Sequence, residues 1–241
     1  ARLTLWTDQA EDFKGRMKTI GNSASIGLML VLIFLVLTLR PIVAFWVAVG
    51  IATAYAGAFV FLPAVDVSLN MLSTFAFLLV LGIVVDDAIV VGEGIHTEAH
   101  NTGGGVTAAI AGAQLVAKPV IFAVLTTIMA FLPWLFSSGS TSEFTRHITW
   151  VVILALIFSL VEALWILPAH LSKMKPRHEM DMGWFGHFQK RISDSIIHFA
   201  HTYYRRIGQA AVDHRYLTFC IFFVVLVVGF ALFNIGWVKK D

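Results

Sequence analysis

The chain has 241 residues, of which 58% are hydrophobic and only 13% are charged, and its mean hydropathy is +0.82. A soluble domain usually has about 45–50% apolar and about 25% charged residues, so this composition argues against a soluble domain and indicates a membrane protein. The formal net charge of +2 says little about partners, and the single cysteine, Cys220, excludes an internal disulfide or a cysteine metal cluster.

The amino-terminal residues contain neither an initiator Met nor the basic, apolar and small-residue regions of a signal peptide. Leu3 and Leu5 alternate with Arg2 and Thr4, and this alternation predicts a short strand, although no partner strand follows nearby. A strand without a partner at the start of a chain suggests a segment of something larger. We therefore expect this chain to be a piece of a longer polypeptide.

Six apolar runs are long enough to cross the apolar core of a bilayer, which takes about 17–25 residues. Arg40-Pro41 separates the first two runs and predicts a tight turn, because Pro disfavours a helix at the preceding residue. Pro63 and Pro168 are expected to end the second and fifth runs. The pattern predicts an all-α fold, a polytopic transmembrane helical bundle. In chain order the six runs cover residues 23–39, 42–62, 69–95, 119–136, 148–167 and 216–235.

Glycine and alanine residues predict close packing and a turn rather than chemistry. In the second run, small residues recur every four positions and allow another helix to approach closely. Between the third and fourth runs, Gly103-Gly104-Gly105 lacks the following Lys and Ser or Thr of a phosphate-binding loop, which predicts a flexible connection. The small residues of the second run form two rows, Ala48, Ala52, Ala56 and Gly50, Ala54, Ala58.

Lys and Arg residues concentrate in one connection, residues 172–215, and positively charged connections stay on the cytoplasmic side of a membrane. The connection around Asp66 has neither residue type, and the connection around Ser140 has only Arg146. We therefore expect residues 172–215 to lie inside the cell and, with six spans, both chain ends to lie outside. The cationic residues are Lys173, Lys175, Arg177, Lys190, Arg191, Arg205, Arg206 and Arg215.

An amphipathic helix is predicted within this basic connection. Apolar residues recur at spacings of three and four, and cationic and polar residues fall between them. Such a helix lies along the inner membrane surface, and the alternative is a helix that packs on its neighbours with its charged face in water. Four histidines, His187, His198, His201 and His214, are too widely spaced for a compact set, so no metal site is expected. The apolar face consists of Phe185, Phe188, Ile192, Ile196, Phe199, Tyr203 and Ile207.

Two adjacent carboxyl groups, Asp86 and Asp87, lie within the third run. An Asp near the bilayer centre costs about 2.5–3.5 kcal/mol on insertion scales, which is seldom tolerated without a role. Neighbouring residues on a helix point about 100° apart, so the two side chains face different neighbours while remaining close in space. We expect both to be held away from water, where the pair titrates as a unit with zero, one or two protons. The pair therefore predicts a proton relay.

A compensating cation is expected from outside this chain, because no Lys or Arg lies in the apolar middle of any of the six runs. Glu93, seven residues after Asp86, falls on the same helix face. It lies about 10 Å further toward the inside. There it either lines a proton path or lies at the membrane interface. For Glu162, in the fifth run, a position at the membrane interface is the favoured interpretation.

The residues around the Asp pair resemble a known family, the resistance–nodulation–division (RND) efflux permeases. Gly-Ile-Val-Val-Asp-Asp-Ala-Ile-Val-Val-Gly-Glu at residues 82–93 is similar to the fourth transmembrane helix of these permeases. Residues 22–40 resemble their second helix, and two later segments resemble the fifth and sixth, so the likeness covers nearly the whole chain. The residues of those later segments are Pro119, Thr126-Thr127, Phe131-Leu132-Pro133, Ser159-Leu160-Val161-Glu162-Ala163-Leu164 and Leu167-Pro168-Ala169-His170-Leu171.

The resemblance implies a proton-driven antiporter of the bacterial inner membrane, normally a homotrimer that works with a periplasmic adaptor and an outer-membrane channel. It implies that Asp86 and Asp87 carry the protons, with no cofactor. In the order of the family the six spans are helices two to seven of twelve. The first helix, the periplasmic domains and the second half with its Lys are absent from this sequence, so the chain alone is not expected to transport.

The resemblance also implies a substrate class. Metal-exporting relatives tend to have Asp-Ala-Ala with a nearby Met at the position of the pair, whereas this chain has Asp-Asp-Ala and no Met closer than Met71. It is therefore similar to the branch that exports hydrophobic and amphiphilic compounds.

Taken together, these expectations divide the chain into four parts. They are a periplasmic end segment (1–22), a five-span bundle (23–171), a basic cytoplasmic loop with the amphipathic helix (172–215), and a sixth span with a periplasmic end (216–241). Both ends of the chain are then periplasmic. The expected partners are membrane lipid and the second half of the permease, and no nucleic acid is expected.

Two alternatives to a transporter use the same helices. An intramembrane aspartyl protease also has two buried carboxyls, but its pair comes from two facing helices, whereas Asp86 and Asp87 are consecutive and no Gly-x-Gly-Asp sequence is present. A non-transporting sensor or assembly module is the other alternative, and only the Asp pair argues against it.

Overall fold

The computed structural model describes residues 9–38, 40–139, 142–173 and 184–234, and every element within these ranges is helical. The all-α prediction is therefore confirmed for the described residues. The strand predicted around Leu3 and Leu5 lies outside them. The chain divides into two units, Ala1–Asp181 and Met182–Asp241, and each is considered by itself.

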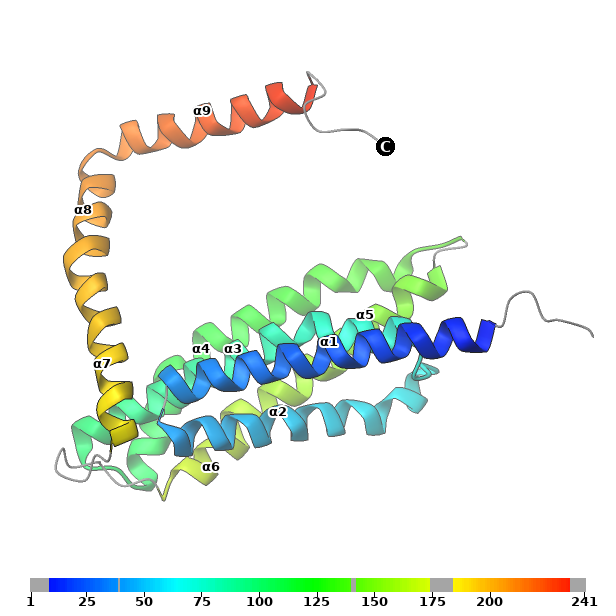
Figure 1. Cartoon of the computed structure of the whole chain (residues 1–241), viewed down its shortest axis with the longest axis horizontal. Coiled ribbons are helices and arrows are strands. Elements are labelled where there is room, and N and C mark those ends of the chain that lie inside the picture. Colours follow the sequence, from blue (N-terminus) through cyan, green and yellow to red (C-terminus); the bar gives the residue numbers. More distant parts are fainter. Residues whose placement is uncertain (1–8, 39, 140–141, 174–183, 235–241) are drawn as a thin grey trace, which may run out of the picture. The chain divides into compact units, whose positions relative to one another are not determined.

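The first unit is a bundle of long helices that pack against one another (Figure 1). Two of its helices end in a short 3-10 turn, and a third passes through a π-helical turn. In chain order the elements are α1 (Gln9–Thr38), α2 (Pro41–Phe61) with 3-10 turn Leu62–Val65, α3 (Met71–Thr102), α4 (Val106–Phe131) with 3-10 turn Leu132–Phe136, α5 (Ser142–Val161), π turn Glu162–Ile166, and α6 (Leu167–Leu171).

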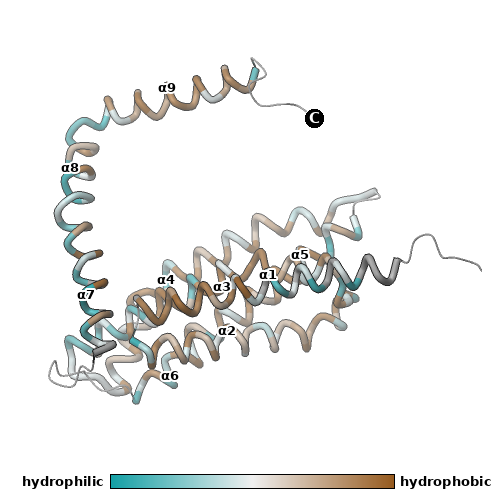
Figure 2. The backbone as a smooth tube through the Cα atoms, in the orientation of Figure 1, coloured by the Kyte–Doolittle hydropathy of each residue, from teal (hydrophilic) through white to brown (hydrophobic). Residues whose placement is uncertain are grey.

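Within the part of the chain that the structure describes, five helices are long and apolar enough to cross a membrane: Pro41–Val65, Met71–Thr102, Val106–Phe136, Ser142–Leu171 and Arg215–Asn234. Each of them overlaps one of the six predicted spans, with different ends. The first predicted span falls on α1, where Gly21–Leu37 is a shorter apolar stretch. Figure 2 shows apolar residues along α9, whereas α7 and α8 alternate between apolar and polar residues.

The first helical hairpin forms where the sequence predicts it. Thr38 ends α1, and Arg40 at the start of α2 has an extended backbone (φ −56°, ψ 140°), as expected for a residue before Pro41. In α2, only the Gly50, Ala54 and Ala58 row is buried, while Ala52 and Ala56 of the other row are exposed. One small-residue row therefore packs and the other lines the outer surface of the bundle.

Three glycines form the connection between α3 and α4, where the sequence predicts a break between two helices. Gly103, Gly104 and Gly105 all have positive φ (90°, 83° and 92°), a conformation that other residues rarely adopt. α4 then begins at Val106, so the expectation that the fourth span starts at Pro119 misplaces the start of this helix. Lys118 consequently lies within α4, at an exposed position.

Pro168 does not end the fifth span, and this prediction was wrong. The helix continues as α6 to Leu171 through the π turn Glu162–Ile166. A proline ring clashes with the carbonyl four residues earlier, here Leu164 inside the π turn, and a wider turn relieves that clash. The Leu167 N–H donates to the Glu162 carbonyl across the turn.

Close glycine contacts hold α3 at the centre of the bundle. A Cβ atom at Gly92 would lie 3.0 Å from a Val43 methyl, and one at Gly112 of α4 would lie 2.6 Å from the Gly94 carbonyl oxygen. The Tyr55 hydroxyl of α2 also donates a 2.8 Å hydrogen bond to the carbonyl of Phe77 in α3. α3 contacts α1, α2, α4, α5 and α6.

The second unit contains α7 (Trp184–Phe199), a π turn (Ala200–Tyr204), α8 (Arg205–Asp213) and α9 (Arg215–Asn234). The predicted amphipathic helix is confirmed as helix, and its position on a membrane surface stays a prediction. Between α8 and α9, Thr218 donates to the carbonyls of Ala211 and His214 (3.0 and 3.2 Å). This hydroxyl supports the turn at which the polar helix passes into the apolar α9.

Candidate proton-relay site

α3 places the Asp pair at its midpoint. Asp86 and Asp87 are the sixteenth and seventeenth of its 32 residues. The helix starts at a capping box in which Asn70 accepts from the N–H groups of Leu72 and Ser73 (2.9 and 3.0 Å), and it ends at Gly103. Because both ends are fixed by local sequence signals, the pair lies about 23 Å from either end.

The two carboxyls point in different directions, as predicted for neighbours on a helix. Asp87 is 6% exposed and lies on the face of α3 that packs in the bundle, whereas Asp86 is on the exposed face. The expectation that both are enclosed therefore holds within this chain only for Asp87. Asp86 lies on the outer surface of the bundle that this chain forms.

Asp87 faces a buried hydroxyl of the neighbouring helix. Ser159 of α5 is 1% exposed and is the hydroxyl that Asp87 faces. The Asp87 Oδ2 and Ser159 Oγ atoms have no hydrogen-bond partner among the described residues. Buried polar atoms in folded proteins are nearly always hydrogen-bonded, so this pair marks a place where protonation or an added polar group changes the packing energy.

Glu93 lies on the same exposed face as Asp86. Its side chain is 55% exposed, and its Oε1 atom is 3.9 Å from Nδ1 of His96, one turn further along. Arg40, at the turn between α1 and α2, is near enough to interact electrostatically with Glu93. Glu93 therefore lies beside the end of the bundle that carries the first helical hairpin.

Glu162 is in the interior of the bundle, so the interpretation that placed it at the membrane interface was wrong. It is 3% exposed and is the first residue of the π turn. Its carboxyl lies against Gly50, the tenth of the 21 residues of α2. The sequence signal that was missed is the continuation of the helix past Pro168, which moves Glu162 away from the helix end.

The Asp pair and Glu162 have no cation beside them within the described ranges. Neither the exposed Asp86 nor the buried Asp87 and Glu162 make an ion pair with Lys or Arg in that part of the chain. Lys118 is exposed on α4, and no three His, Cys, Asp or Glu side chains come together in a way that could hold a metal ion among the described residues.

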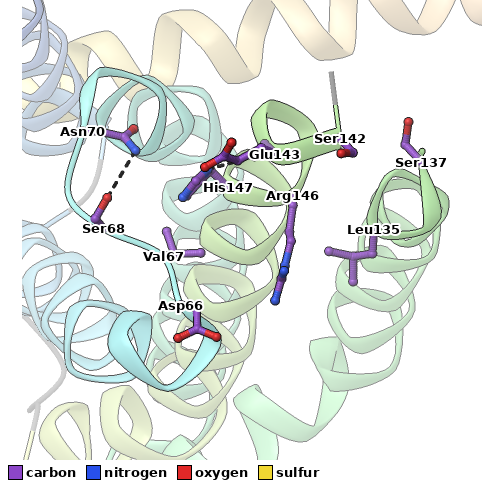
Figure 3. Close-up of a pocket in the computed structure, with 10 residues that line it drawn as sticks. All are labelled: Asp66, Val67, Ser68, Asn70, Leu135, Ser137, Ser142, Glu143, Arg146 and His147. Carbon is purple, nitrogen blue, oxygen red and sulfur yellow. Dashed lines mark hydrogen bonds between the residues drawn. The ribbon is translucent and has the colours of Figure 1, made fainter. Parts of the chain in front are cut away.

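A polar hollow of about 620 Å³ opens at the end of the bundle far from Glu93. Sequence reasoning did not identify it, because its residues come from two separate connections. In Figure 3 the Arg146 side chain of α5 extends into it between Asp66 and Leu135. Asp66 has a left-handed backbone (φ 56°). The other lining residues are Val67, Ser68, Asn70, Ser137, Ser142, Glu143 and His147.

The sequence matches the model of the AcrB/AcrD/AcrF family over residues 2–236, which is nearly the whole chain. This match agrees with five helices of spanning length and with an acidic pair at the middle of the central helix. The chain therefore belongs to the AcrB/AcrD/AcrF family of RND proteins, and it is a portion of a membrane transporter rather than an enzyme.

Proposed function

We propose that this chain is the transmembrane half of a proton-driven efflux antiporter, in which Asp86 and Asp87 carry the protons. The observation that carries this proposal is the position of Asp87. It is 6% exposed at the midpoint of the central helix, and one of its oxygens is buried without a hydrogen-bond partner within the described ranges. A neutral Asp87 fits this packing, whereas an unpaired carboxylate there is costly.

Proton exchange at Asp87 can therefore change the arrangement of helices. When the carboxyl loses its proton, the packing of α3 on α5 holds the charge away from water, with the Ser159 hydroxyl as the polar group that it faces, so an arrangement that supplies water or a cation is preferred. When it regains the proton, the observed packing is restored. A pH difference of about one unit supplies about 1.4 kcal/mol per proton, and about 100 mV supplies about 2.3 kcal/mol. Either is enough to bias a balanced two-state equilibrium about tenfold.

Asp86 has a different role in this proposal, because it is on the outer surface of the bundle. There it can face a second half of the transporter and a Lys that this half supplies. Glu93, on the same face, is the candidate for the proton path toward the inside. Approach of the Lys would favour ionised carboxyls and release a proton, and its withdrawal would favour recapture.

Family membership and the sequence support the remaining features of the proposal. The exported compounds are hydrophobic or amphiphilic, the intact protein is a homotrimer in the bacterial inner membrane, and it works with a periplasmic adaptor and an outer-membrane channel. The ends of this chain are periplasmic. Membership in a transporter family supports this proposal over an intramembrane protease.

The proposal is tested in the full-length transporter, reconstituted in vesicles with a pH gradient. Asp86→Asn and Asp87→Asn each hold one group neutral, and we expect each to abolish proton-driven export while insertion into the membrane is unchanged. Glu98→Gln, the same change further along α3, is the matched control and should export normally. Normal export by either Asn variant would refute the relay.

A further inference from the structure

Glu162 is a carboxyl in the bundle that the Asp-pair relay does not use. It is 3% exposed, and a Cβ atom added at Gly50 would overlap its Cδ and both of its oxygens. The carboxyl therefore occupies the space that any side chain at position 50 would fill. Gly50 belongs to the buried small-residue row of α2. This row allows close packing of the helices, and at Gly50 it also leaves room for the Glu162 carboxyl.

The π turn presents Glu162 to α2. The turn lies immediately before Leu167 and Pro168, where the proline removes one backbone donor and crowds the carbonyl of Leu164. A π turn inserts one residue into a helix and is often found at functional sites. The helix has a π turn at this point, and the residue that begins it is the buried acid.

No charged group among the described residues compensates Glu162. None of the described residues donates a hydrogen bond to its carboxyl or forms an ion pair with it. The titratable groups on the helices packed around Glu162 interact with other residues or face outward. The Tyr55 hydroxyl donates to the Phe77 carbonyl, Asp87 faces Ser159, and Asp86 and Glu93 are exposed. His96 lies 3.9 Å from Glu93, and His170 contacts the Ile166 carbonyl and the Trp46 ring. The neutral acid fits this site, and the carboxylate does not.

Glu162 and Asp87 lie at the same level of the bundle. α2 and α3 are antiparallel and meet where Gly92 contacts Val43 and Val47. Asp87 lies five residues before Gly92 on α3, and Gly50 lies three residues after Val47 on α2. Because the two helices run in opposite directions, these offsets lead to the same level, and Glu162 packs against Gly50 there. On α5, Ser159 faces Asp87 and precedes Glu162 by one turn, about 4.5 Å along the axis. A movement of this helix therefore alters the surroundings of both acids.

We propose that Glu162 is a third proton-carrying group of the bundle. It is neutral while the π turn packs against Gly50, and it is ionised when the π turn and α2 separate. On separation the acid gives its proton to water that enters beside α2, and it takes a proton from water before the helices close again. This inference rests on the proposed relay and extends it from the α3–α5 contact to the α2–π-turn contact.

The experiment uses the full-length transporter in membranes and dicyclohexylcarbodiimide, which modifies protonated carboxyls in apolar surroundings. In the Asp86→Asn/Asp87→Asn background, mass spectrometry should find the peptide containing Glu162 modified, with modification falling as pH rises. Glu162→Gln should remove the signal. No modification of Glu162 at any pH would overturn the inference.

Export measurements separate this inference from the relay. Glu162→Gln should lower proton-driven export at least about tenfold, equivalent to about 1.4 kcal/mol, and flatten its pH dependence, while Glu162→Asp should retain part of both. Glu143→Gln, at the exposed start of α5, is the matched control and should not change export. Should the Gln variant fail to reach the membrane, the Asp variant and the labelling decide.

Each remaining outcome has one meaning. If Asp87→Asn abolishes export and Glu162→Gln keeps the wild-type rate and pH profile, the third proton carrier is wrong and the Asp-pair relay stands. If either Asp86→Asn or Asp87→Asn exports normally, the relay itself is wrong, and the inference that rests on it falls with it.

Discussion

Position 50 shows how one missing side chain shapes the interior of this bundle. The Glu162 carboxyl lies where a Cβ would be, so Gly50 is required for close approach and not for backbone freedom. We expect Gly50→Ala to destabilise the protein by about 1–3 kcal/mol, the usual cost of overpacking a core. Thermal unfolding in detergent measures this. Gly82→Ala on α3, where an added methyl meets nothing within 4 Å, should leave the melting temperature nearly unchanged.

A double substitution identifies the cause of that loss. In Gly50→Ala/Glu162→Ala the added methyl no longer meets a carboxyl, so the two changes should be less destabilising together than the sum of the single changes. Simple additivity would mean that Gly50 and Glu162 do not share this space.

At the residue scale the sequence predicts some of the site and misses the rest for a physical reason. Asp86 and Asp87 stand out because insertion of an acid into an apolar run is costly wherever the run folds. Which of them is buried depends on the packing of α3 against α5, and this information is absent from a single helix. Glu162 lies six residues before Pro168, where the fifth run was predicted to end, whereas the helix continues to Leu171 and leaves Glu162 further from its end.

At the element scale, hydropathy identifies the helices but not their ends. The prediction for the third span stops at residue 95, while α3 continues to Thr102 through a polar last stretch. α4 begins at Val106 because the glycine turn ends there, although apolarity becomes continuous only after Lys118. A hydropathy pattern reports where lipid would be tolerated, whereas helix ends are set by capping and turn residues.

The π turn supports a prediction about a whole element. Pro168→Ala restores a donor for the Leu164 carbonyl, so the turn should relax to α-helix and rotate the residues beyond it by about 100°. His170 would then leave Trp46, whose ring centroid is 3.9 Å from its own. Cysteines at 46 and 170, in a Cys220→Ser background, should be joined by a short thiol cross-linker only when Pro168 is present.

Pro119 provides the matched control for this experiment, because it is an exposed proline inside the continuous helix α4. Pro119→Ala should leave the cross-link between positions 46 and 170 unchanged. Equal cross-linking with and without Pro168 would show that the π turn has another cause.

At the scale of the whole molecule, the outer surface of the first unit is strongly apolar. Large side chains such as Phe45, Phe75 and Phe122 are more than half exposed, at 56%, 52% and 63%. Exposed apolar patches of this kind mark surfaces that contact lipid or another protein. Asp86 lies on an exposed face of the same unit, and contact between lipid and a carboxyl is energetically costly. The surface around Asp86 therefore suits contact with another protein better than contact with lipid.

The direction of the bundle in the membrane stays a prediction from the distribution of Lys and Arg, and it can be tested at two serines. Ser137 lines the polar hollow at the end of the bundle predicted to be outside, and Ser195 is on α7, predicted to be inside. In the full-length protein without Cys220, Ser137→Cys should react with a membrane-impermeant thiol reagent in intact spheroplasts. Ser195→Cys should react only after the membrane is permeabilised. The reverse pattern would invert the topology, and the proton path would then run from Glu93 toward the outside, because Glu93 and the hollow lie at opposite ends of the first unit.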